Sequence, residues 1–513
     1  MPETTIILYL CVVASIMIIF RQCWRDKWRH QAHRPPSPTS FPIIGNALSI
    51  PSGPQQFAFM ELGKQLNSDI LFLNIFGKQI LVLNSVQAAS ELLDKRSAKY
   101  SDRDLGAMIT DPSLMDWSAN VLGARYGDLW RYYRRLLNNW LNAREVVQFH
   151  SLQQHQVRLL LQRLLKGTSS PNPFRQVRDE IRYTMACTMF QLAYGYRLQG
   201  PQDPWFQQAR LTIHRLTEGP LVTNFLVNAL PALVYVPKWF PGAGWKRIAK
   251  TWKNDKEKAL NEPYEWTKSQ LAAGVAEPSI LSALLQEHKL VSNLSLEERD
   301  RRLKELAIII YAGGTDTSAS LLVSFVAAMV KNPIAQAKAQ EELDHVLGPL
   351  TLPTLSDKER LPYVRNLIQE VMRIYPVIPS GVPHVCFEDD IYRGYKIPKG
   401  TAVAMSRDNT HYPDPEVFNP DRFLSANVPL VPGFGWGRRK CPGTHLADDS
   451  AFLSIASMLS VYNFFKKRDV KGKEIEPNIE CGSNALALEL RPFAFEYEPR
   501  SDKHRQLILE SAN

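Results

Sequence analysis

The stretch of sequence that decides the fold runs from Phe434 to Gly443 and reads FGWGRRKCPG. Glycines at positions 433, 435 and 437 allow a tight loop whose backbone can come close to a flat object. Three basic residues at 438–440 place positive charge beside the Cys441 sulfur, and a helix that starts at Pro442 would add the positive end of its dipole. Both effects favour the thiolate. One thiolate without zinc-like partners suits an axial ligand of haem iron.

Two other interpretations of this stretch fit less well. A buried structural cysteine would suit an apolar pocket rather than a cationic, glycine-rich loop. The glycines do not form a dinucleotide-binding fingerprint, because Arg438 stands in the place of the third glycine and no strand precedes them.

The pattern Phe-x-x-Gly-x-Arg-x-Cys-x-Gly is formed here by Phe434, Gly437, Arg439, Cys441 and Gly443. It resembles the haem-binding loop of the cytochrome P-450 family of haem-thiolate monooxygenases, and the resemblance extends over the whole chain. It implies a mainly α fold with small β-sheets, the cytochrome P-450 fold. It also implies haem b as the cofactor, Cys441 as the thiolate ligand of its iron, and Phe434, Arg439 and Gly443 among the residues that bind it.

A second motif lies inside a long apolar helix, from Ala312 to Ser318, and reads AGGTDTS. Two glycines inside a helix cost about 1 kcal/mol each relative to alanine, so they call for a reason. Thr317 can bond back to the carbonyl of Gly313, which would open the helix and make room for a small molecule. Close helix packing through glycine is the alternative. The resemblance implies that this groove binds oxygen and that Asp316 and Thr317 are catalytic residues that deliver protons.

Two further elements match the family. Glu370 and Arg373 share a helical face at i,i+3 spacing, and the resemblance adds Arg422 as the third member of a structural network that supports the cysteine loop. Alone, such a spacing is usually a solvated face. Trp130 and Arg134 also share a face, and this pair resembles the one that contacts a haem propionate. The resemblance implies that Arg439 and His384 are further propionate contacts. The family often has arginine at the position of His384, and a satisfied surface histidine is the alternative.

Composition excludes several classes of protein. The chain has 513 residues, 45% of them hydrophobic and 22% charged, so it is neither a disordered chain nor a miniature scaffold. Its net charge of +10 suggests an anionic surface or an acidic partner protein, without singling out nucleic acid. Six scattered cysteines are too few for a disulfide framework, which indicates a reducing compartment.

The N-terminus predicts a membrane anchor. Thr4 to Phe20 is an uncharged run near the lower limit of about 17 residues for a spanning helix. A cleaved signal peptide is the alternative, but the basic residues follow the run rather than precede it, which places the rest of the chain in the cytosol. We therefore expect a transmembrane anchor at 1–24, a basic and proline-rich hinge at 25–46 and one haem-thiolate monooxygenase domain at 47–513. The expected location is the endoplasmic reticulum membrane, single-pass, with a cytosolic catalytic domain.

Periodicity predicts long helices and a few short strands. Helices are expected over 129–165, 175–195, 206–217, 297–331 and about 361–375. A hairpin is expected from strands at 71–76 and 79–83 around Gly77-Lys78, and strand signals return at 391–397 and 486–497.

The resemblance implies insertion of one atom of O2 into a carbon–hydrogen bond of a sizeable apolar substrate. Electrons would come from a membrane-bound NADPH-dependent cytochrome reductase, with cytochrome b5 as a second candidate donor. Two alternatives stay open: the same fold catalysing desaturation, oxidative coupling or rearrangement, and a non-catalytic haem electron carrier or sensor. Residues 236–244 look like those of filamentous-fungal members, which implies a secondary-metabolite substrate.

Overall fold

The computed structural model describes residues 33–221, 224–286, 289–405, 408, 411–482 and 486–511. Helices dominate the chain, and three small sheets complete it. The α-helices are α2 Gln55–Gln65, α3 Val86–Ala89, α4 Ala107–Thr110, α5 Asp128–Leu141, α6 His150–Lys166, α7 Pro173–Tyr194, α8 Pro204–Glu218, α9 Trp245–Ala272, α10 Ile280–Leu285, α11 Leu296–Lys331, α12 Pro333–Leu347, α13 Pro362–Ile374, α14 Thr444–Val461 and α15 Asp502–Glu510. Short 3-10 or π turns are η1 Ala47–Ser49, η2 Ser90–Lys95, η3 Glu145–Phe149, η4 Leu226–Asn228, η5 Pro231–Tyr235, η6 Leu355–Arg360, η7 Pro420–Leu424 and η8 Gly437–Arg439.

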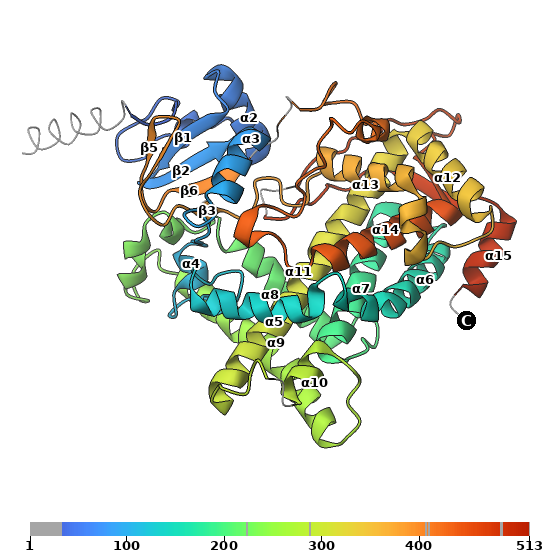
Figure 1. Cartoon of the computed structure of the whole chain (residues 1–513), viewed down its shortest axis with the longest axis horizontal. Coiled ribbons are helices and arrows are strands. Elements are labelled where there is room, and N and C mark those ends of the chain that lie inside the picture. The colour runs from blue at the N-terminus through green and yellow to red at the C-terminus, as the bar shows by residue number, and fades with distance from the viewer. Residues whose placement is uncertain are drawn as a thin grey trace, which may run out of the picture.

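Helix α11 runs through the middle of the helical body, where it packs against α7, α9, α13 and α14 (Figure 1). Its N-terminal half lies in one hydrophobic cluster with α5, α7, α8 and α9, and its C-terminal half lies in a second with α6, α13 and α14. Among the described residues, α11 is the helix long and apolar enough to cross a membrane, but 56% of that stretch is buried. We therefore treat α11 as a core helix.

The largest sheet has the strand order β1-β2-β6-β3 and lies beside the helical body (Figure 1). Strands β1 and β2 form an antiparallel hairpin, β2 pairs in parallel with β6, and β3 pairs antiparallel with β6. The hairpin turn is sharp because Phe76 and Gly77 both have positive φ, at 49° and 87°. The strands are β1 Ile70–Ile75, β2 Lys78–Leu83, β3 His384–Val385, β4 Asp390–Tyr392, β5 Tyr395–Ile397, β6 Ala402–Met405, β7 Tyr462–Lys466 and β8 Phe495–Pro499.

Most of the expected elements are confirmed. The hairpin, the helices at 175–195, 206–217, 297–331 and 361–375, and the strand pair around Arg393-Gly394 are all present within a few residues. The single helix expected over 129–165 is wrong, because Asn142 adopts an extended conformation and its side chain caps the amides of Arg144 and Glu145. The strand expected over 486–497 is also wrong in length, since β8 begins at Phe495.

The proline-rich segment is attached to the sheets over its described part. Pro36 accepts a hydrogen bond from the Phe72 amide, and His33 accepts one from the Lys396 amide. The Asn46 side chain accepts from the Asn74 amide at 2.7 Å. Residues 33–46 are therefore held against β1 and β5. The predicted anchor at 1–24 and the first part of the hinge lie outside the described residues.

Candidate functional site

The cysteine loop is closed by its own backbone. The Cys441 amide donates a hydrogen bond to the carbonyl of Phe434, 2.9 Å away, so the two ends of the loop meet. Gly435 and Gly437 have φ of 77° and 54°, in the left-handed region that favours glycine. A side chain at Gly437 would collide with the backbone of Leu93, so the close approach that this glycine allows is made to η2.

Burial and three nearby polar groups act in opposite directions on the pKa of the Cys441 thiol. Cys441 is open on one side, and the protein packed around its other sides raises the pKa of its thiol. The Gly443 amide, Arg134 of α5 and Lys440 act in the opposite direction. Arg438 and Arg439 direct their N–H groups toward other partners, the Tyr126 hydroxyl for Arg438 and the carbonyls of Ser101 and Ala124 for Arg439.

The helix expected from Pro442 begins two residues later. Helix α14 starts at Thr444, with Gly443 as its N-cap, and the Thr444 hydroxyl donates to the Cys441 carbonyl at 2.8 Å. The positive end of the helix therefore follows the cysteine directly.

Three guanidinium groups gather beside this loop, those of Arg103, Arg134 and Arg439. The positive charge of Arg439 lowers the pKa of Arg103, and that of Arg134 lowers the pKa of Arg439, although burial is the largest cause for both. Within the part of the chain that the structure describes, their hydrogen-bond acceptors are backbone carbonyls, and none forms an ion pair with a carboxylate. The bonds join Arg134 to Lys440 (2.7 Å), Arg439 to Ser101 and Ala124 (2.8 Å each) and Arg103 to Pro383 (2.7 Å).

Trp130 organises two of these arginines. It is 7% exposed, and its ring centroid lies 5.9 Å from the Arg134 guanidinium and 4.8 Å from that of Arg439. Stacking of this kind holds a guanidinium in place while its N–H groups stay directed along its edge. The shared face expected for Trp130 and Arg134 is thus present in α5, and Arg439 joins it from the cysteine loop.

His384 lies in β3 and is 4% exposed, so it is not a surface histidine. Its Nδ1 is 2.7 Å from the Tyr100 carbonyl, and because a carbonyl only accepts, Nδ1 carries the proton. Burial, together with Arg103 and Arg439, lowers the pKa of His384 to about 3. The proton on Nδ1 leaves Nε2 free of this bond, and the expected contact of His384 with a haem propionate stays a prediction.

The two glycines of α11 serve different purposes. A side chain at Gly314 would collide with Met189 of α7, so this glycine allows close helix packing. A side chain at Gly313 would meet nothing within 4 Å, so this residue borders open space. The Thr317 hydroxyl donates to the Gly313 carbonyl, as expected. The predicted opening of the helix is not seen, because α11 is continuous from Leu296 to Lys331.

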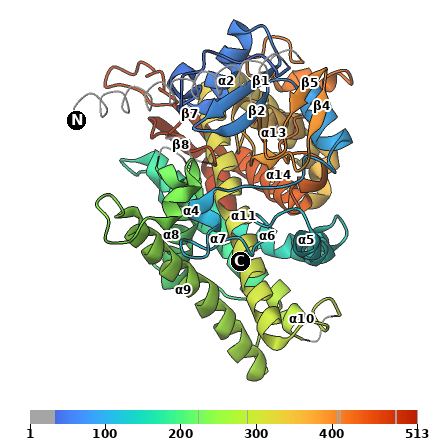
Figure 2. The same cartoon turned by 90° about the vertical axis from the view of Figure 1, so that its left-hand side faces the viewer.

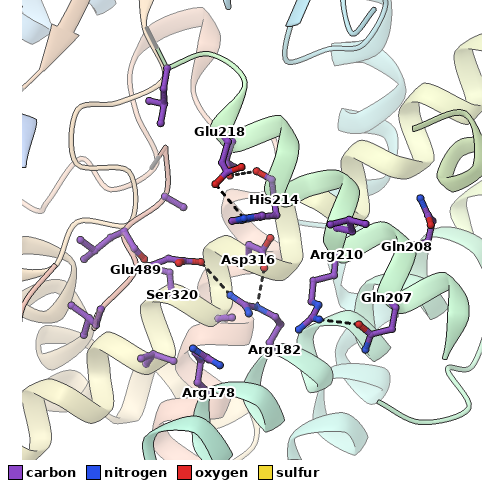
Figure 3. A pocket seen from close by; sticks show the side chains of 18 of the residues that line it. Arg178, Arg182, Gln207, Gln208, Arg210, His214, Glu218, Asp316, Ser320 and Glu489 are labelled. Carbon is purple, nitrogen blue, oxygen red and sulfur yellow. Dashed lines mark hydrogen bonds and ion pairs between the residues drawn. The ribbon is translucent and has the colours of Figure 1, made fainter. Parts of the chain in front are cut away.

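Asp316 faces a cavity of about 810 Å³ between α7, α8, α11 and the segment before β8 (Figure 3). Its carboxylate lies 3.2 Å from Arg182, which also lies 3.4 Å from Glu489. Burial raises the pKa of Asp316, and Arg182 opposes that shift. On the opposite wall, Nε2 of His214 lies 3.3 Å from the carboxylate of Glu218, both on α8. Asp316 and Thr317 thus adjoin different spaces, although they are neighbours in the helix.

Comparison with known proteins gives the family. The model of the family "Cytochrome P450" matches residues 35–490. The chain belongs to the cytochrome P450 family. It is 36% identical to "Cytochrome P450 monooxygenase 98" of Postia placenta, with 93% of each chain covered. It is 34% identical to "Tryptamine 4-monooxygenase" of Psilocybe cyanescens, with 92% of this chain and 93% of that protein covered. It is also 34% identical to "Cytochrome P450 monooxygenase claR" of Ampulloclitocybe clavipes, covering 92% and 88%.

Membership confirms the fold, the haem-thiolate cofactor and the class of enzyme, a monooxygenase. A P450 also implies a redox partner, O2 and an organic substrate, and fungal members are commonly membrane-associated.

The residues of this P450 fit a haem group. Among the described side chains, no cluster of three or more His, Cys, Asp or Glu could hold a metal ion by itself, and a single thiol stands in the loop. Beside it, Arg103, Arg134 and Arg439 have no bonded carboxylate in the described part of the chain, which leaves cationic donors for a ligand with carboxylate groups.

The structural network that supports the P450 loop is complete. Glu370 is fully buried and accepts from Arg373 at 2.7 and 2.9 Å and from Arg422 at 3.1 Å. Both arginines then donate to the backbone carbonyl of Val417, so α13 is tied to the segment that leads to η7 and on to the cysteine loop. The expected triad of Glu370, Arg373 and Arg422 is confirmed.

Sequence reasoning missed Arg103, Arg182 and Glu489. Arg103 meets Pro383 across 280 positions, and Arg182 meets Glu489 across 307. No local spacing signals contacts of this range. For Arg103, the signal that was present is the surplus of basic residues, which becomes informative only when the fold shows which of them have no acidic partner. Arg182 pairs with Asp316 and Glu489, so this signal does not apply to that pair.

Proposed function

We propose that this P450 oxidises a sizeable apolar organic molecule, a fungal secondary metabolite, with Cys441 as the thiolate ligand of haem b. When bound, haem supplies the iron at which O2 is activated, so that one oxygen atom enters the substrate and the other leaves as water. The observation that carries the proposal is the meeting of the Cys441 loop with three buried or half-buried arginines that have no carboxylate partner among the described residues.

Three groups of residues would hold the haem and shape its site. Arg103, Arg134 and Arg439 would bind the haem carboxylates, and Trp130 orients two of them. Phe434 and Gly443 shape the loop on either side of the cysteine. His384 fixes Tyr100, the residue next to Ser101, whose carbonyl anchors Arg439.

Thr317 and Asp316 would handle the protons that the reaction takes up. The Thr317 hydroxyl is held at the Gly313 carbonyl, beside the open space of α11. Asp316 reaches the solvent-connected cavity of Figure 3 and has a raised pKa, which suits a group that exchanges protons. Helix α11 would thus take protons from the cavity on one side and pass them to the Gly313 side.

The hydrophobic cluster that includes the α11 residues before Gly313 supports an apolar substrate. Residues of α4, the segment after it and η4 belong to the same hydrophobic cluster as Ile310 and Ala312, the α11 residues that precede Gly313. Only a few polar groups would recognise the substrate, and contacts with apolar side chains would dominate its binding.

Membrane attachment would use two regions. The predicted anchor at 4–20 is the first, and exposed apolar side chains between α8 and α9 are the second. The described N-terminal end and this second region, drawn in green, both lie toward the left of Figure 1. The second region exposes Leu226, Tyr235, Trp239 and Phe240, with fractions of 56, 87, 81 and 51%. Deletion of residues 1–33 should move the protein from the membrane fraction toward the soluble one while its haem spectrum survives. Loss of folding would contradict the anchor.

Isotope labelling tests the function. The protein is produced with an NADPH-dependent reductase, supplied with candidate metabolites under labelled O2, and its products are weighed by mass spectrometry. One labelled atom per product molecule supports monooxygenation. Products without label, or with two hydrogens removed, would favour rearrangement or desaturation. Cys441→Ala should abolish product and the thiolate-type spectrum of the reduced, CO-bound haem, whereas retention of that spectrum would mean that another residue holds the iron.

A further inference from the structure

The cavity that Asp316 faces is lined by both charged and apolar side chains. It lies where α7 and α8 pass beside α11 (Figure 2), and the segment before β8 completes its lining. Its volume of about 810 Å³ is within the range of clefts that hold small organic molecules. Gly313 and Thr317 do not line it, so this cavity is separate from the open space beside Gly313.

The acidic side chains of this lining are already paired within it. Asp316 and Glu489 both pair with Arg182, at 3.2 and 3.4 Å. The third acid, Glu218, lies 3.3 Å from Nε2 of His214. Each acid that lines the cavity therefore has a basic partner in the same lining, and two further arginines remain.

These two arginines, Arg178 and Arg210, have hydrogen-bond donors to spare. Arg210 of α8 donates to the Gln207 side chain at 2.9 Å and, among the described residues, pairs with no carboxylate. Arg178 of α7 donates to Asp179 through Nε and Nη2, at 3.0 and 2.9 Å, which leaves its Nη1 outside this contact. Because a guanidinium carries five N–H donors, both groups can still bind an anion.

Arg182 joins these two arginines into one basic cluster. Arg178 and Arg182 are four residues apart on α7, so they share a helix face. Burial raises the pKa of Tyr311, and Arg182 and Arg210 both oppose that shift, so these two arginines act on the same side chain. In Figure 3 the three arginine side chains gather at the end of the cavity away from Glu218. An anion bound there would meet positive charge from α7 and from α8.

The surface beside this basic cluster is apolar and well fixed. Phe174 is 2% exposed, and its ring centroid lies 5.8 Å from the Arg178 guanidinium, so the charge stands next to an apolar face. Val323 of α11 and Leu488 before β8 are also buried and line the same cavity. The Ser320 hydroxyl donates to the Leu488 carbonyl at 2.6 Å, which holds that segment on α11.

We propose that this cavity is a second binding site, which takes an organic carboxylate with an apolar body. Its carboxylate would bind Arg178 and Arg210, because a guanidinium matches a carboxylate in shape and charge. Its apolar part would lie on Phe174 and Leu488. The site goes beyond the proposed function, since it involves neither the haem nor the substrate. Its consequence alone rests on that function: a bound acid would fill the cavity from which Asp316 is proposed to take protons, a position that suits an inhibitory effector.

Isothermal titration calorimetry of the full-length holoprotein with 4-phenylbutanoate tests the site. 4-Phenylimidazole is kept at saturation to occupy the haem iron, so that binding at the iron does not contribute. 4-Phenylbutan-1-ol lacks the charge and acetate lacks the apolar body, so each should bind more weakly by about tenfold or more. Arg175→Gln is the matched control variant, because Arg175 is exposed on α7 and lies outside the lining.

We expect Arg210→Gln to weaken binding by about tenfold, since a hydrogen bond to a charged group contributes that much. Arg178→Gln should weaken it less, because Asp179 already shares that guanidinium. Glu489→Gln should tighten binding by about threefold, because Arg182 loses an exposed carboxylate that competes with the ligand. A damaged fold would not produce such a gain. Arg175→Gln should bind as the parent does.

Unchanged affinity in both Arg210→Gln and Glu489→Gln would overturn the proposal, and so would equal binding of the alcohol or of acetate. If Arg210→Gln does not fold, Arg178→Gln and Glu489→Gln decide, because they must change affinity in opposite directions. The thiolate-type CO spectrum of the parent is recorded in parallel. Its loss would contradict the proposed function, whereas the calorimetric result alone decides the carboxylate site.

Discussion

Arg134 of α5 donates a hydrogen bond to the backbone carbonyl of Lys440, 2.7 Å away, and Lys440 directly precedes Cys441. Helix α5 is thereby fixed to the cysteine loop, and the side chains that neighbour this bond point outward. Arg131 and Arg135 on α5 and Arg438 and Lys440 on the loop are exposed. A basic surface therefore surrounds the outer side of the thiolate loop, on two elements that cannot shift independently.

We predict that Arg135→Glu combined with Lys440→Glu slows haem reduction by an acidic reductase. Exposed charges steer encounter and act over about 10 Å at 0.1 M salt, so the defect should be largest at low ionic strength. Stopped-flow reduction against salt concentration measures it. Lys471→Glu with Lys473→Glu, on the exposed loop after β7, makes the same charge change elsewhere. Equal slowing by both pairs would mean that the net charge of the protein, not this surface, sets the rate. If neither pair slows reduction, the surface has no role in docking.

Thr317→Ala should leave haem content and ligand binding intact but lower the product formed per NADPH consumed. The hydroxyl is held at the Gly313 carbonyl beside the open space, and its loss removes an ordered donor there. Thr317→Ser keeps the hydroxyl and should recover most of the coupling. Product, NADPH and peroxide are measured together. If alanine and serine variants couple as well as the parent, Thr317 takes no part in proton handling.

Glu370→Gln should destabilise the protein strongly and lower the fraction that binds haem. Glu370 is fully buried and is the carboxylate shared by Arg373 and Arg422, so its neutralisation leaves two buried cations without a charge partner. Breaking a buried pair of this kind costs about 3–5 kcal/mol. Glu359→Gln is the control, because Glu359 pairs with Arg365 at the surface and is 77% exposed. Thermal unfolding and the CO spectrum report both variants; similar losses would contradict a special role of the buried triad.

Local patterns in the sequence were reliable wherever the determining contacts are local. The β1–β2 hairpin follows from two short apolar runs on either side of Gly77-Lys78. The Thr317–Gly313 bond follows from i,i−4 geometry, and the Glu370–Arg373 pair from i,i+3 spacing. Even the break at Asn142 has a local cause, a side-chain cap that competes with the helix, but the helical periodicity of the residues on both sides masks it.

The sequence identified many residues of the candidate site, but it did not show how their side chains are arranged. The cysteine motif singled out Cys441 and Arg439. It did not show that Arg439 turns away from the sulfur toward Ala124, because that choice depends on carbonyls that the fold delivers from 315 positions away. The same holds for Arg103, whose role depends on its burial. It also holds for His384, whose role depends on burial and on the carbonyl that its Nδ1 meets. A count of charged residues does not show which partner each of them contacts.

Glu305 gives the clearest prediction for pH. Burial raises the pKa of its carboxyl to about 7; Glu257 and Asp116 act in the same direction, while Lys256 of α9 and Arg301 of its own helix oppose it. In the unfolded chain, the Glu305 carboxyl releases its proton at about pH 4.3. The folded state therefore holds the proton more tightly, so its contribution to stability is complete below that pH and is lost as the pH rises through about 7. The loss amounts to on the order of 3 kcal/mol.

Glu305→Gln keeps the neutral shape of the side chain at every pH and should remove this dependence. We expect the variant to exceed the parent in melting temperature by a gap that widens between about pH 5 and pH 7 and is constant above that range. Glu341→Gln, an exposed position on α12, should show no such gap. Thermal unfolding of the holoproteins across this range measures both. A parent that becomes more stable than the variant as the pH rises would mean that ionised Glu305 gains more from Lys256 than it loses by burial.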